Sequence, residues 1–101
     1  MYPRFIHPQA AVVWSAATTG SAGNSNTLQA RDCPFVSAFG HVSGATTVTL
    51  MYSFDGTTFY AGPSTTLAGA SDFHIDATTG AEYLALQSSS SVTATAVISA
   101  K

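Results

Sequence analysis

Three ionisable side chains, Asp72, His74 and Asp76, occupy alternate positions of one short run. Alternate residues of a β-strand point to the same side, about 6.5–7 Å apart. Carboxylates and an imidazole in such a row are groups that can bind a metal or transfer protons. Ligands from a single strand diverge, however, and a mononuclear site draws on more than one element. We therefore interpret the row as a solvated strand face, and we predict neither a metal nor a cofactor.

Nucleophilic catalysis has no positive support in the sequence. Residues 20–23, Gly-Ser-Ala-Gly, lack the Gly-x-Ser-x-Gly spacing of a nucleophile elbow, and the chain has no Gly-Lys-Ser/Thr phosphate loop. Cys33 stands beside Asp32, whose negative charge disfavours a reactive thiolate. We expect Cys33 to be a small buried residue, and we predict that the protein is not an enzyme.

Aromatic side chains next to Asp55 suggest a different chemistry. Phe59 and Tyr60 are consecutive, so on a strand their rings point to opposite faces. A ring exposed among hydroxyl groups can stack on a sugar, whereas a cross-strand pair in the core or at its rim needs no ligand. We keep Asp55, Phe59 and Tyr60 as candidate glycan contacts.

Charge is the unusual feature of the composition. The 101 residues include 3 Lys+Arg and 5 Asp+Glu, so that 8% are charged, against about 25% in ordinary soluble domains. Thirteen serines and fourteen threonines predict a neutral, hydroxyl-rich surface instead. Three scattered cations cannot neutralise a run of phosphates, and no apolar stretch reaches the roughly 18 residues of a membrane span. We expect neither a nucleic acid nor a membrane as the partner.

The elements that must position these residues are strands. Helical spacing of apolar residues is missing, whereas β-branched and aromatic runs are separated by Gly, Ser, Asn and Pro clusters. The clearest run alternates from Thr46 to Phe54, and Asp55-Gly56 after it predicts a type I′ hairpin that returns at 57–61. Further strands are predicted at 10–16, 28–32, 35–42, 65–67, 71–76, 82–87 and 92–100.

These strands predict an all-β fold, an antiparallel β-sandwich of seven or eight strands, with jelly-roll and immunoglobulin-like topologies both open. We expect residues 10–101 to form a single domain. We expect residues 1–9 to form an extended arm, because Pro3 and Pro8 have no amide to donate to a sheet. Val, Ile, Leu and Phe together number only 21, so we expect aromatic rings to make up a large part of the core.

Two segments resemble a known family. Residues 48–60, Val-Thr-Leu-Met-Tyr-Ser-Phe-Asp-Gly-Thr-Thr-Phe-Tyr, resemble a hairpin of small β-sandwich proteins in tailed-bacteriophage particles. Residues 80–87 and 92–101 are similar to their closing strands, so the resemblance spans 46–101. It implies a structural, non-catalytic protein of the virion: a capsid decoration (cement) protein, a head fibre or a tail accessory protein.

The resemblance also implies partners and a location. A decoration protein binds the major capsid protein or other virion subunits and stabilises the shell, here as a homo-oligomer, with a trimer favoured. We expect Tyr2, Phe5 and Ile6 of the arm to lie over a neighbour. The prolines of the arm interrupt any signal-peptide core, so we expect synthesis in the host cytoplasm and a place in the virion. The alternative is a glycan- or receptor-binding module of a phage fibre or tail.

Overall fold

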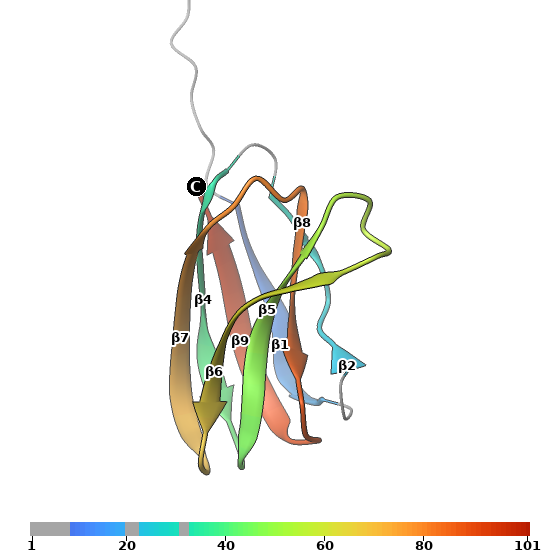
Figure 1. Ribbon diagram of the computed structural model, residues 1–101. Coiled ribbons are helices and arrows are strands. Elements are labelled where there is room, and N and C mark those ends of the chain that lie inside the picture. Colours follow the sequence, from blue (N-terminus) through green and yellow to red (C-terminus); the bar gives the residue numbers. More distant parts are fainter. Residues whose placement is uncertain (1–8, 20–22, 31–32) are drawn as a thin grey trace, which may run out of the picture.

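The computed structural model describes residues 9–19, 23–30 and 33–101, and it is all-β, with two antiparallel sheets (Figure 1). Sheet A has the order β1-β9-β4-β7, and sheet B the order β2-β8-β5-β6, with β3 also paired to β8. No helix in the described ranges is long and apolar enough to cross a membrane. The strands are β1 (Gln9–Thr18), β2 (Gly23–Asn24), β3 (Leu28–Gln29), β4 (Phe35–Val42), β5 (Thr46–Ser53), β6 (Tyr60–Leu67), β7 (Ser71–Thr78), β8 (Tyr83–Ser88) and β9 (Thr93–Ala100).

Most strands lie where the alternation of apolar and polar residues predicts them. The prediction at 35–42 coincides with β4, and those at 71–76 and 92–100 match β7 and β9 within two residues. Residues 60–61 of the strand predicted at 57–61 and all of the strand predicted at 65–67 belong to one strand, β6, whereas residues 57–59 lie before it. The strand predicted at 28–32 is the shorter β3, and residues 31–32 lie outside the described part.

The tight hairpin predicted after β5 is wrong. β5 ends at Ser53 and β6 begins at Tyr60, so a longer loop replaces the two-residue turn. A type I′ turn needs positive φ at both central residues. Gly56 has a φ of 81°, but Ala16 is the only non-glycine residue with positive φ in the described chain, so Asp55 does not adopt the required conformation.

The core consists mainly of aliphatic and small side chains, and the expectation that aromatic rings make up a large part of it is wrong. Of the described aromatic residues only Trp14 and Phe73 are buried, and Phe54, the last residue of the predicted alternating run, is 72% exposed. Because alanines occupy alternate positions of the central strand β9, the facing sheets leave little room for rings. The six alanines of the core cluster are Ala30, Ala38, Ala81, Ala94, Ala96 and Ala100.

Close approach of β4 and β9 requires a glycine. A Cβ atom on Gly40 would overlap the carbonyl oxygen of Thr95 and lie 2.7 Å from the Cα atom of Ala96. On the other side of β9, the register of β1 shifts twice. These β-bulges bend β1, so that two consecutive residues, Val13 and Trp14, are both buried.

Candidate interaction surface

The outer face of sheet A gathers exposed aliphatic and aromatic side chains. Strand register aligns Val12, Val97, Phe39 and His74 in one row across β1, β9, β4 and β7. Val12 is 56% exposed and Phe39 is 44% exposed, and Phe35, on the same face of β4, is 62% exposed. We call Val12, Phe35, Phe39 and Val97 the apolar strip.

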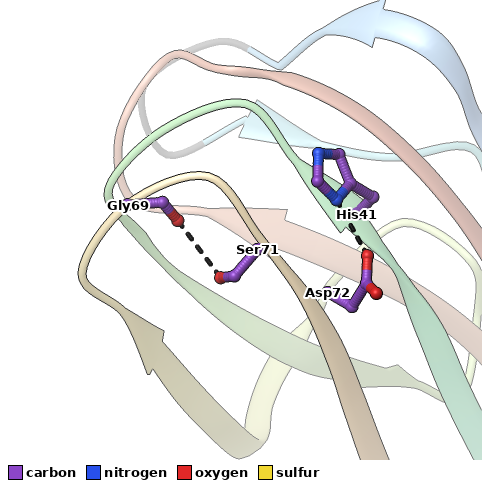
Figure 2. Close-up of polar contacts among 4 residues, drawn as sticks. All are labelled: His41, Gly69, Ser71 and Asp72. Carbon is purple, nitrogen blue, oxygen red and sulfur yellow. Dashed lines mark hydrogen bonds and ion pairs between the residues drawn. The ribbon is translucent and has the colours of Figure 1, made fainter.

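Two histidine–aspartate pairs border the apolar strip. Figure 2 shows His41 of β4 and Asp72 of β7 pointing toward one another, with 2.8 Å between Nδ1 and Oδ1. On β7, His74 Nε2 lies 2.9 Å from Asp76 Oδ1. Phe39 meets the ring of His74 edge to face, with 6.3 Å between the ring centroids. All four ionisable groups are exposed, so each pair contributes at most about 1 kcal/mol and mainly orients its side chains.

The row of Asp72, His74 and Asp76 points to solvent, as predicted, and the intervening Phe73 and Ile75 are buried. The three groups do not converge, since His41 pairs with Asp72 while His74 pairs with Asp76. Among the described residues no group of three or more His, Cys, Asp or Glu side chains is placed to hold a metal ion.

The turn before β7 is closed by a side chain. Ser71 Oγ donates to the carbonyl oxygen of Gly69 at 3.1 Å, as Figure 2 shows beside the His41–Asp72 pair. From there the register of β7 on β4 runs without a shift from Ser71 to Thr78. The outward-facing side chains of β7 therefore keep a regular spacing along the edge of sheet A.

The second predicted site, at Asp55, Phe59 and Tyr60, lies on the β5–β6 loop and at the first residue of β6, and this loop projects at the upper right of Figure 1. Asp55 Oδ1 accepts the N–H groups of Thr58 and Thr57, at 2.9 and 2.8 Å, and the hydroxyl of Ser53 at 3.0 Å. These donors, the Thr58 amide first, hold the pKa of Asp55 below its ordinary value of 3.8. The carboxylate braces the loop, so one of its oxygens is occupied within the chain.

The same loop leaves two rings in solvent. Gly56 lies over the ring of Tyr83, where an added Cβ atom would lie 3.5 Å from three ring atoms. Phe54 and Tyr60, at 72% and 60% exposure, flank the loop, and Phe59 is half-buried. Sequence reasoning did not identify Phe54 as an exposed ring of this loop, because Phe54 continues the alternating pattern of β5. The available signal was Ser53 two residues before Asp55, a pattern typical of turns closed by side-chain oxygens.

The predicted arm contacts, Tyr2, Phe5 and Ile6, lie outside the described residues. The described chain starts at Gln9, whose Cα pairs with that of Ala100. Phe35 and Lys101 exchange two backbone hydrogen bonds, at 3.0 and 2.9 Å, at the same end of sheet A. Cys33 is buried, as expected.

A scan against protein-family models finds no match for this chain, and a search of curated proteins finds none either. The described residues define an all-β protein whose two antiparallel sheets enclose a core of aliphatic and small side chains. Its exposed apolar side chains concentrate on the outer face of sheet A, with a second, smaller group on the β5–β6 loop.

Proposed function

We propose that this chain is a non-enzymatic structural protein of a bacteriophage particle, a capsid decoration protein that binds and stabilises the shell. The observation that carries the proposal is the apolar strip. Exposed apolar patches mark contact sites for other proteins, and aromatic residues are enriched at the centres of such interfaces. Here most of the described aromatic rings lie outside a core of aliphatic and small side chains.

The strand order supports a jelly roll. The first and last strands, β1 and β9, are neighbours, and the chain passes from sheet A to sheet B between β4 and β5 and back between β6 and β7. An immunoglobulin-like sandwich instead places its first two strands side by side in one sheet, whereas β2 and β3 lie in the sheet opposite β1. If β2 and β3 count as one interrupted strand, the order is that of eight strands in two four-stranded sheets. Jelly rolls recur in viral capsid and lectin domains.

The proposed partners are the major capsid protein or other virion subunits. Phe35 and Phe39 lie on the same strand and are both exposed, so they can act as paired anchors, because a few buried aromatics carry most of the energy of an interface. The arm, through Tyr2, Phe5 and Ile6, adds a second contact, since the described chain begins at the same end of sheet A as Phe35.

The test is whether the chain is a component of particles. Phage particles purified on a density gradient from the culture that carries the gene are expected to contain it in a fixed ratio to the shell protein, as measured by quantitative mass spectrometry. A chain that stays in the soluble fraction contradicts the proposal. Deleting residues 1–9 is expected to abolish attachment while the circular dichroism spectrum stays unchanged, and full occupancy by the truncated chain contradicts the role of the arm.

A second candidate function, a glycan- or receptor-binding module of a fibre or tail, is favoured by one observation. Phe54 and Tyr60 are exposed on either side of a loop that Asp55 braces. Because Oδ1 of Asp55 is already occupied, sugar contacts would come mainly from stacking on the rings. Binding to a glycan array by the full chain, lost in a Phe54→Ala/Tyr60→Ala variant that still folds, supports this function. An array with no bound glycan removes it.

A further inference from the structure

Strand β7 is a long, regular edge of sheet A. It pairs with β4 over eight residues without a register shift, and β4 is its only hydrogen-bonded neighbour in the described sheet. It contains no proline and no glycine. Such an edge presents unpaired backbone N–H and C=O groups, which are a template for a further strand.

The other edges of the described sheets are interrupted. β1 carries two register shifts, and Asn26 donates its N–H to the carbonyl oxygen of Val13 at 3.2 Å. β6 contains Pro63 and a register shift against β5. β2 and β3 have two residues each. Bulges, prolines and short strands are among the devices that stop edge pairing, and β7 has none of these three. Charged side chains are another such device, and those of β7 are Asp72 and Asp76.

We propose that β7 pairs with β7 of a second copy of this chain, antiparallel and centred on Ile75, so that sheet A continues across a two-fold axis. In this register His74 stands opposite Asp76 of the second copy, and Asp72 stands opposite Thr78 of the second copy. Each carboxylate then faces an imidazole or a hydroxyl. The molecule already contains one cross-strand pair of this kind, His41 with Asp72.

Charge complementarity selects this register over its neighbours. A pair centred on His74 would place Asp72 of each copy opposite Asp76 of the other. A pair centred on Asp76 would place the two copies of Asp76 opposite each other. Like charges directly across a strand pair are destabilising. Centring on Phe73 keeps a histidine–aspartate pair but joins only residues 71–75, whereas centring on Ile75 joins residues 72–78.

This inference does not rest on the proposed function, because it concerns the chain alone in solution. It also gives a dimer, whereas the resemblance to phage proteins implies a trimer. A chain that is monomeric in solution would overturn the dimer but would not bear on the particle assignment, which has its own test. Absence of the chain from particles would overturn the particle assignment but would not bear on the dimer.

The experiment is the solution mass of the full chain, measured by light scattering on a sizing column over a dilution series. We expect a species of twice the 10.4 kDa chain mass that falls to the single mass on dilution. The His74→Asp variant is expected to remain monomeric at every concentration, because it places two carboxylates opposite each other at both central pairs. The double variant His74→Asp/Asp76→His exchanges the two residues and is expected to restore the dimer.

The matched control is Thr93→Asp, which adds the same charge to the same sheet at an exposed residue of the interior strand β9. Its mass is expected to equal that of the natural chain, and circular dichroism shows whether each variant folds. A natural chain that is monomeric throughout, a trimer, or a dimer that His74→Asp leaves intact would each overturn the proposal. A double variant that stays monomeric while folded rules out the register centred on Ile75.

Discussion

The outer faces of the two sheets are built on the same alternation but carry different chemistry. Sheet A presents the apolar strip and two histidine–aspartate pairs. Sheet B presents neutral hydroxyl and amide groups that bond to one another, such as Thr47 Oγ1 to Thr66 Oγ1 at 3.1 Å and Gln87 Nε2 to Asn24 Oδ1 at 3.3 Å. A partner that covers sheet A buries apolar surface, which is favourable. A partner that covers sheet B removes water from polar groups, which is costly, and buries little apolar surface in return. The difference indicates which face is suited to a partner.

The largest expected effect is on attachment to particles. Replacing Phe35 and Phe39 by serine removes both aromatic anchors, which at about 2 kcal/mol each corresponds to roughly a thousandfold loss of affinity. The change in folding stability is expected to be small, because both side chains are exposed. Thr47→Ser with Thr49→Ser on sheet B is the control, and its occupancy on particles, measured by quantitative mass spectrometry, is expected to stay unchanged. Equal losses from the two faces would contradict the comparison.

A pair of glycines compares how tightly the two sheets are built. Gly40→Ala is expected to cost about 3 kcal/mol or more, because the new Cβ meets the backbone of β9. In sheet B, the Cβ atom added by Gly62→Ala would lie 2.7 Å from the ring of Tyr52 and 2.9 Å from the carbonyl oxygen of Leu50. The ring can move, so we expect a smaller loss for Gly62→Ala in urea unfolding. The reverse order would show that sheet A is the more adaptable.

The β5–β6 loop is expected to depend on one buried hydroxyl. Ser53 is fully buried, and its Oγ accepts the N–H of Gly56 at 2.9 Å while donating to Asp55. Ser53→Ala removes the acceptor of the Gly56 N–H and one of the three donors to Asp55, and is expected to cost about 1–3 kcal/mol. Urea unfolding gives the loss, and amide hydrogen exchange is expected to quicken at Gly56. Unchanged exchange would mean that the loop holds its shape without the hydroxyl.

The smallest expected effect is a pH dependence of the same loop. The pKa of Asp55 in the folded chain lies below its ordinary value of 3.8 because of the Thr58 and Thr57 amides. The ionised carboxylate therefore stabilises the fold above that value, and this contribution is lost as the pH falls through the lower, folded pKa. We expect the difference in thermal midpoint between the natural chain and Asp55→Asn to shrink on acidification. A difference that is constant with pH would show that ionisation is not involved.

The alternation of apolar and polar residues predicted most of the strands. It could not predict which face of a strand is buried where both alternating sets of residues are apolar. Phe73 and Ile75 alternate with charged residues, so their burial could be foreseen. Phe35 and Phe39 alternate with Val36 and Ala38 instead, and a period of two cannot say which set faces inward. Val36 and Ala38, the smaller side chains, are the buried set, because the space between β4 and the facing sheet is too shallow for two phenylalanine rings.

The candidate surface was harder to predict than the fold. Its residues come from four strands, and His41 meets Asp72 across 31 positions of the sequence. Only the order of the strands brings such groups together, and no local pattern encodes that order. The shape of the β5–β6 loop was mispredicted for another reason, because Asp-Gly signals a turn but does not reveal that the Asp55 side chain, rather than the backbone, closes it.

Pairing of the first and last strands has a practical consequence for anyone who attaches something to this protein. Gln9 and Ala100 are cross-strand neighbours, so their backbones lie about 5 Å apart. An affinity tag or a displayed peptide fused after Lys101 would start next to Gln9, where the described chain begins, and beside Phe35. Gln9 and Lys101 are far apart in the sequence but close together in space. A fused group there would therefore compete directly with both proposed attachment contacts, residues 1–9 and Phe35.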